Sequence, residues 1–246
     1  MPFDLTPLAA LWMAVALFGA AYVRGYCGFG FAALVVSGAG LVTDPLYFVP
    51  VVIAADFLLT GVQARQIRPN IDWRRVGTLF AGSLFAVPVG VWIIASIGTD
   101  TARAVISVFI LIMCAILWAG WRMARPAGDA AHLATGVISG LANGAAVGGL
   151  PVAAFFSAQT IPAATFRATL IAYFTALDLW TLPNMLRAGM VSRDTLIATA
   201  MGMPLLLLGL WLGGRRFLSA APEDFRRFAI ILLAVLATLG IVKALA

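Results

Sequence analysis

The sequence predicts an all-α, polytopic integral membrane protein that consists of two inverted repeats. Three observations lead to this prediction: an apolar composition, a series of segments long enough to cross a bilayer, and two glycine-rich interruptions about 119 residues apart. Of the 246 residues, 63% are hydrophobic and 11% are charged, whereas soluble domains carry about 25% charged residues. Together with a mean hydropathy of +1.02, this composition excludes a soluble domain.

The basic residues and the cysteines exclude two further classes of protein. The net charge of +6 comes mainly from arginines in short loops between apolar segments, and no basic patch with interleaved aromatic residues indicates nucleic-acid binding. Cys27 and Cys114 both lie inside apolar segments, so we expect neither a disulfide framework nor a metal site. The first six residues lack the positive charge of a cleaved signal peptide, and we expect the first apolar segment to be retained.

The first repeat, residues 1–125, contains one interrupted segment and three complete ones. A bilayer core about 30 Å thick needs about 20 apolar residues per helix. Three segments meet this length: 45–64, 74–97 and 101–121. Residues 5–42 are too long for one crossing and are interrupted from Arg24 to Gly30. We expect two short helices that form a re-entrant hairpin, because Leu8 to Val23 would give only about 24 Å of helix.

The second repeat, residues 126–246, follows the same plan within the single transmembrane domain. Its interrupted segment, 132–159, is broken from Asn143 to Pro151. Three complete segments follow: 163–186, 192–212 and 225–245. The motif Pro88-Val89-Gly90-Val91-Trp92 matches Leu207-Leu208-Gly209-Leu210-Trp211 at nearly the same offset as the interruptions. This agreement favours a duplicated chain over a chance similarity of apolar helices.

The distribution of basic residues predicts that the second repeat is inverted relative to the first. If each interrupted segment enters and leaves on one side, about 11 arginines lie on one face and about four basic residues on the other. The positive-inside rule then places the arginine-rich loops 65–75, 122–131 and 213–227 in the cytoplasm of a bacterial plasma membrane. Both termini would lie outside the cytoplasm.

The two interruptions are the candidate substrate site. Non-helical backbone at membrane depth is tolerated where it is buried in protein or lines a polar cavity. The free N–H groups at the start of the second short helix of each pair suit an anion, and glycine allows the anion to approach the backbone closely. We therefore expect these residues to bind the substrate: Arg24, Gly25, Cys27, Gly28, Phe29, Gly30, Asn143, Gly144, Gly148, Gly149 and Leu150.

Three ionisable residues, Arg24, Asp56 and Asp178, lie well inside the apolar segments. Charge is costly in a bilayer and indicates function by default. The Arg24 guanidinium is suited to two oxygens of a sulfite, sulfonate or carboxylate, or alternatively to an ion pair with Asp56. Asp178 either carries a coupling proton or accepts hydrogen bonds from its helical neighbours, for which the candidates are Thr175, Thr181 and Asn184.

Other residues at the interruptions allow a packing role instead of a binding role. Gly136, Gly140, Gly144 and Gly148 recur every four residues, as in close helix contacts. Cys27 is interpreted as a small apolar filler rather than a reactive thiol, because only Arg24 is near enough in sequence to activate it. His132 is expected to be a solvated histidine at the membrane interface.

The length, the two halves and the motifs Gly25-Tyr26-Cys27-Gly28-Phe29-Gly30 and Gly144-Ala145-Ala146-Val147-Gly148-Gly149-Leu150-Pro151 resemble the TauE/SafE sulfite exporter family of bacterial membrane permeases. The resemblance covers essentially the whole chain. It implies a membrane carrier for sulfite, sulfoacetate or other organosulfonates, with the bilayer and this small anion as partners. The first motif departs from the family pattern, because Ala32 and Ala33 follow it where a proline is usual.

We expect a transporter rather than an enzyme, with no cofactor and with export by alternating access. An inside-negative potential favours export of an anion by about 2.3 kcal/mol per 100 mV. Two alternatives remain open: an anion channel with the same residues, and an uptake permease coupled to protons or sodium through Asp56 and Asp178. A third, a membrane enzyme acting through Cys27, lacks a nearby histidine or carboxylate.

Overall fold

The computed structural model describes residues 2–124, 126–217 and 222–245, and this part of the chain is helical without strands. Two short 3-10 helices lie at Pro2–Asp4 and Arg68–Asn70. The described residues form ten α-helices: α1 (Pro7–Cys27), α2 (Phe31–Gly40), α3 (Pro45–Ile67), α4 (Trp73–Ser96), α5 (Thr99–Ala119), α6 (Asp129–Asn143), α7 (Gly149–Ser157), α8 (Ala163–Arg187), α9 (Arg193–Phe217) and α10 (Pro222–Leu245). The chain is thus an all-helical, multi-pass membrane protein.

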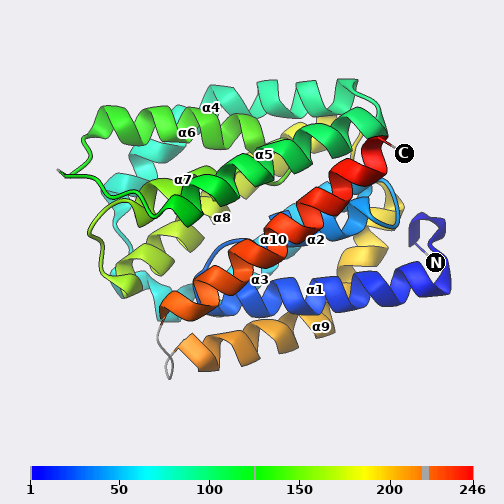
Figure 1. The fold of residues 1–246 in the computed structure, drawn as a ribbon, viewed down its shortest axis with the longest axis horizontal. Helices are drawn as coiled ribbons and strands as arrows, with labels where there is room; N and C mark the ends of the chain where they lie inside the picture. Colours follow the sequence, from blue (N-terminus) through cyan, green and yellow to red (C-terminus); the bar gives the residue numbers. More distant parts are fainter. Residues whose placement is uncertain (1, 125, 218–221, 246) are drawn as a thin grey trace.

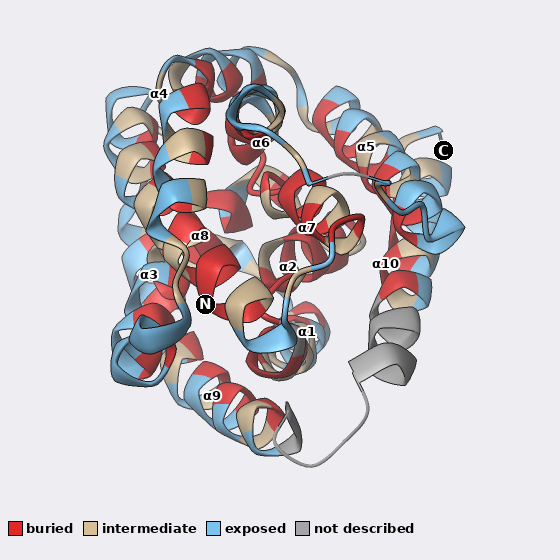
Figure 2. Cartoon of the chain, turned by 90° about the vertical axis from the view of Figure 1, so that its left-hand side faces the viewer, coloured by how far each residue is buried: buried red, intermediate tan, exposed pale blue. Residues whose placement is uncertain are grey.

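The two short helices, α2 and α7, lie in the middle of the molecule and the longer helices surround them (Figure 2). Three long pairs form most of this surround: α1 packs along α9, α6 along α4, and α5 along α10. The α3 and α8 helices pack against each other, and in addition α3 contacts α9 and α8 contacts α4. The packing partners therefore correspond between the two halves of the chain.

Two helical hairpins bring the interruptions toward the interior. α1 begins at the end of the molecule where the N-terminus lies, whereas α6 begins at the opposite end (Figure 1). α1 starts at Pro7, with the Thr6 hydroxyl accepting a hydrogen bond from the Ala9 N–H at 3.3 Å. It ends at Gly28, whose φ of 81° is the left-handed conformation that glycine adopts readily.

The first helix is longer than the sequence suggested. α1 has 21 residues, or about 32 Å at about 1.5 Å per residue, and it is long enough to cross a bilayer. The premise that this helix spans only residues 8–23 is therefore wrong. The helix continues through Arg24 because α3 supplies polar partners for the guanidinium. α6, with 15 residues, is shorter, at about 22 Å.

Five helical stretches of the described residues are long and apolar enough to span a membrane: Pro7–Tyr26, Pro45–Asn70, Trp73–Ser96, Thr99–Ala119 and Arg193–Arg215. α8 is not among them, although residues 163–186 were predicted as a complete span. It carries buried polar side chains, including Arg167, Thr169 and Asp178, because it packs against other helices rather than lipid. The N-terminal turns of α10 lie partly outside the residues whose side chains are described.

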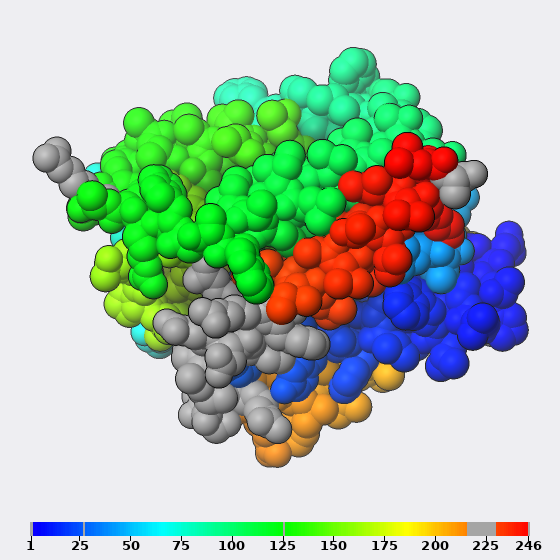
Figure 3. Space-filling model, in the orientation of Figure 1, coloured from blue at the N-terminus to red at the C-terminus, as the bar shows by residue number. Residues whose placement is uncertain are grey.

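The outer surface of the helices is apolar, as lipid contact requires. α5 and α10 lie side by side on one face of the molecule (Figure 3). Their exposed side chains there include Val105, Val108, Ile112, Ile231, Val235 and Leu239. In a soluble protein such a continuous apolar face would mark an interaction site, whereas in a bilayer it contacts acyl chains.

Glycines allow two of the long helix pairs to approach closely. In the α4–α6 pair, a Cβ on Gly82 would meet the backbone of Leu133, and a Cβ on Gly136 would meet the backbone of Leu79. In the α1–α9 pair, the backbone of α1 also lies close to two glycines of α9, Gly209 and Gly213. These contacts are of the small-residue type that holds membrane helices together.

Charged side chains tie the helices together at both ends. The exposed Arg74 and Asp129 join α4 to α6 at 2.8 Å, and the Arg74 guanidinium lowers the pKa of the Asp129 carboxyl. At the other end, Arg103 is buried rather than lying in a solvated loop. Its Nε donates to the Gly40 carbonyl at 2.8 Å, so it closes the C-terminal end of α2 against α5.

Candidate functional site

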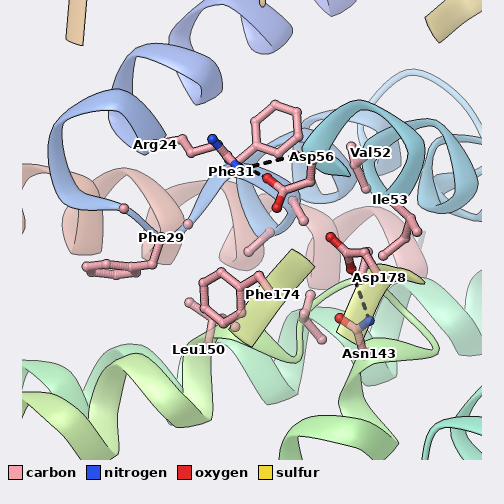
Figure 4. A pocket seen from close by; sticks show the side chains of 17 residues that line it. Arg24, Phe29, Phe31, Val52, Ile53, Asp56, Asn143, Leu150, Phe174 and Asp178 are labelled. Carbon is pink, nitrogen blue, oxygen red and sulfur yellow. Dashed lines mark hydrogen bonds and ion pairs between the residues drawn. The ribbon is translucent and has the colours of Figure 1, made fainter. Parts of the chain in front are cut away.

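A small cavity lies where the two hairpins meet. Its volume is about 40 Å³, room for about three water-sized atoms at about 10–15 Å³ each. Figure 4 shows the side chains around it. The lining residues come from both halves of the chain: Arg24, Gly28, Phe29, Gly30, Phe31, Ala32, Ala33, Val52, Ile53, Asp56, Asn143, Ala146, Val147, Gly149, Leu150, Phe174 and Asp178.

Arg24, in the last turn of α1, is held by α3. The side chain is 2% exposed, and its Nε forms an ion pair with Asp56 Oδ1. One Nη donates to Gln63 Oε1 at 2.9 Å, and the other donates to Thr60 Oγ1 at 2.7 Å and to the Asp56 carbonyl at 3.2 Å. The ion pair that the sequence allowed as an alternative is thus present, and four of the five guanidinium N–H donors are used within the protein.

Asn143, the last residue of α6, occupies the place in the second half that corresponds to Arg24 in the first. Its Nδ2 donates to Thr181 Oγ1 at 2.8 Å and, at 3.4 Å, to Asp178 Oδ1. Thr60 and Thr181 also match, because each hydroxyl donates to the backbone carbonyl four residues earlier in its helix. In each half, the end of the broken helix is therefore bonded to a carboxyl and a threonine on a long helix.

The two halves differ in charge at this point. Asp56 faces a guanidinium, whereas Asp178 faces a neutral amide. Both carboxyl groups point into the same cavity (Figure 4), and they are close enough to interact electrostatically. Thr175, Thr181 and Asn184 were predicted as donors to Asp178, but each donates to a backbone carbonyl of its own helix instead.

The N-termini of α2 and α7 adjoin the cavity. α2 begins after Gly30, with φ of 85°, and α7 begins after Gly148; neither helix has a side-chain cap. The first N–H groups of a helix have no partners within the helix, and the dipole makes this end electropositive. Ala146, in the turn before α7, has φ of 57°, a strained conformation for a residue with a Cβ.

Several residues predicted for the site do not line the cavity. Gly25 faces the backbone of α9, and Gly144 faces the backbone of Gly90 in α4. Gly148 lies against Asn143, and its carbonyl accepts a hydrogen bond from Ser139 at 2.7 Å. The Cys27 side chain lies outside the described residues. Gly25, Gly144 and Gly148 thus have packing contacts, as Gly136 and Gly140 do.

The sequence predicted neither the contact of Arg167 with the first interruption nor the burial of His132. Arg167 of α8 is buried, donates to the Gly25 carbonyl at 2.8 Å and packs against Gly28. No local pattern indicates this contact, because it joins residues 142 positions apart. His132 is buried rather than solvated: its Nδ1 lies 2.9 Å from the Gly128 carbonyl, and its ring packs on Phe155.

Thr60, Gln63 and Phe174 were also missed, although a sequence signal existed for two of them. Thr60 and Gln63 follow Asp56 by four and seven residues, so they lie on the same helix face. Within the described part of the chain, no three His, Cys, Asp or Glu side chains are grouped as metal ligands. The site offers hydrogen-bond donors, one guanidinium and two carboxyl groups to a small polar solute.

One comparison with known proteins identifies a related family. The family model described as "Sulfite exporter TauE/SafE" matches residues 13–240. Searches of curated protein sequences and of solved structures found no match. The matched region includes both hairpins, and all residues that line the cavity fall within it.

Proposed function

Because the chain belongs to the TauE/SafE family of sulfite exporters, which makes it a membrane transporter, we propose that it exports a small sulfur-containing oxyanion. The substrate class is sulfite, sulfoacetate or another organosulfonate. One observation carries this proposal: a cavity with mostly buried lining residues lies between the two helix breaks, and Arg24 and the residues that begin α2 and α7 line it.

The anion would be held mainly by backbone amides. The first turns of α2 and α7 supply N–H donors and electropositive helix ends, and glycines at the breaks leave room for close approach. Arg24 supplies positive charge, but α3 binds most of its donors, so about one N–H is left for a substrate oxygen. Phe29, Gly30 and Gly149 are the proposed backbone contacts, whereas the N–H groups of Gly28 and Leu150 already donate to carbonyls of the protein.

We further propose transport by alternating access between two inverted repeats, residues 1–125 and 126–246. The corresponding pairs α1–α9 and α6–α4 support the repeat, and the opposite starting ends of α1 and α6 support its inversion (Figure 1). In such carriers, one repeat moves against the other around a central site. We propose a bacterial plasma membrane as the location, with loops 65–75, 122–131 and 213–227 in the cytoplasm.

Filling the cavity should abolish anion binding. Ala32 lines the cavity and is half-buried, whereas Ala81 of α4 is exposed on the outer surface. We expect Ala32→Leu to lower sulfite affinity at least tenfold and Ala81→Leu to leave it unchanged. The measurement is calorimetric titration of purified protein in detergent with sulfite, sulfoacetate and methanesulfonate, after melting curves have shown that both variants are folded. Equal affinity of Ala32→Leu and the unsubstituted protein would place the site elsewhere.

Flux through reconstituted vesicles distinguishes a carrier from a channel. A carrier should give saturable uptake of labelled sulfite. Vesicles loaded with unlabelled sulfite should also accumulate the label by exchange. Flux that rises in proportion to concentration, without such counterflow, would contradict alternating access and indicate an anion channel.

A further inference from the structure

The unequal charges of the two matched clusters point to a function for Asp178. In the first half, the end of the broken helix carries Arg24 and forms an ion pair with Asp56; in the second half, it carries Asn143 beside Asp178. We propose that Asp178 is protonated whenever the cavity holds an anion, so that one proton moves with each substrate anion. This inference rests on the proposed function and adds its coupling ion.

The ionisable side chains that line the cavity have unequal numbers of positive and negative charges. Arg24 contributes one positive charge, and Asp56 and Asp178 contribute one negative charge each when ionised. The fully ionised cavity would therefore have a net charge of about −1 before any substrate enters, and about −2 with a monovalent anion. An uncompensated buried charge is strongly unfavourable. One proton on the carboxyl pair leaves the empty cavity neutral. A monovalent anion then gives a net charge of about −1 instead of about −2, and this charge faces the electropositive N-termini of α2 and α7.

The hydrogen bonds indicate which carboxyl takes this proton. Asp56 is held by the Arg24 guanidinium, which is fixed in turn by Thr60 and Gln63. Asp178 receives a long bond of 3.4 Å from Asn143, an amide that binds Thr181 more closely, and its other side-chain partner is the Asp56 carboxyl. Protonation of Asp178 breaks no ion pair, whereas protonation of Asp56 would leave Arg24 without its counter-ion.

Among the described residues, Arg24 is the cation that acts on Asp178. The charged or titratable side chains that act on it are Asp56 of α3, Arg24 of α1 and Tyr173 of its own helix. Tyr173 donates to Ser139 at 2.9 Å. The residue of α6 that bonds to Asp178 is Asn143, which is neutral. The ionisable residues of α4 and α6 lie in or near the first turn of each helix: Arg74, Arg75, Asp129 and His132. On α6, His132 is about 16 Å from Asn143 along the helix, and Asp129 is further away. In the described residues of α7 there is no charged side chain.

Co-transport of a proton changes the force that drives the substrate. A monovalent anion that moves alone would be distributed by the membrane potential, about fifty-fold per 100 mV. The same anion that moves with one proton carries no net charge, so its export follows its own concentration gradient and any pH gradient that is acidic inside, rather than the membrane potential. Substrate and proton must also raise each other's affinity by the same factor, because linkage is reciprocal.

The test uses methanesulfonate, whose charge is constant between pH 5 and 8. For the unsubstituted protein we expect affinity to fall as pH rises, approaching tenfold per pH unit above the point where the empty cavity loses its proton. Asp178→Asn, which imitates the protonated acid, should bind as tightly as the unsubstituted protein at low pH and show no pH dependence. Asp129→Asn, an exposed control on α6, should keep the pH dependence of the unsubstituted protein.

Transport by the unsubstituted protein gives a second test that does not depend on a variant. In proteoliposomes, an imposed pH gradient should drive methanesulfonate accumulation, and a potassium diffusion potential alone should not. Accumulation driven by the potential, or binding that is independent of pH, would overturn the inference while leaving the proposed function intact. Absence of anion binding at every pH would contradict the proposed function and this inference with it.

Discussion

Replacing Arg24 by alanine should abolish transport and also destabilise the protein. The guanidinium makes four hydrogen bonds to α3 and neutralises Asp56 in an environment where Arg24 is 2% exposed. Removing one partner of a buried ion pair costs about 3–5 kcal/mol. We expect a loss of this size in unfolding free energy, measured by denaturant titration in detergent, together with the loss of sulfite transport.

A double variant separates the two effects of Arg24. Arg24→Met with Asp56→Leu replaces the ion pair with apolar side chains of similar length, and such replacements are often neutral for stability. This variant should recover most of the stability lost in Arg24→Ala but none of the transport. If it transported sulfite normally, the ion pair would be only a structural link between α1 and α3.

Substitution of Gly82 should give the second large effect. A Cβ at this position would meet the backbone of Leu133 in α6, which cannot move aside as a flexible side chain would. We expect Gly82→Ala to lower the unfolding free energy by about 1–3 kcal/mol, the usual cost of overpacking. The thermal unfolding midpoint in detergent should fall accordingly.

Gly77, in the same helix, is the matched control. It is exposed, and a Cβ there would meet nothing within 4 Å. Gly77→Ala should leave stability unchanged or raise it by up to about 1 kcal/mol through helix propensity. Equal destabilisation by both substitutions would show that glycine serves α4 through backbone flexibility rather than through contact with α6.

The sequence was most informative where bilayer physics limits the choices. The helices are interrupted within the glycine-rich segments that follow Arg24 and Asn143. Glycine is a poor helix former, and non-helical backbone in a membrane needs hydrogen-bond partners within the protein. The ion pair between Arg24 and Asp56 was also predicted as an alternative, since two opposite charges in apolar surroundings stabilise each other.

The other features of the site depend on contacts between segments that are distant in the sequence, which the sequence alone does not predict. The contact between Arg167 and Gly25 joins distant segments, and nothing around either residue indicates it. The glycines at 144 and 148 fit a binding turn and a helix contact equally well in sequence, and only the position of Gly90 and Ser139 distinguishes the two. His132 is buried because α7 returns alongside α6 and covers it with Phe155.

Selenite can locate the anion that we propose to bind between the N-termini of α2 and α7. Selenite has the shape and charge of sulfite, and selenium scatters X-rays anomalously. A crystal structure of the protein with selenite should show one anomalous peak in the cavity, with selenite oxygens within hydrogen-bond distance of the backbone N–H groups of Gly30 and Gly149. A peak only at the exposed arginines of the loops, with none in the cavity, would contradict the account.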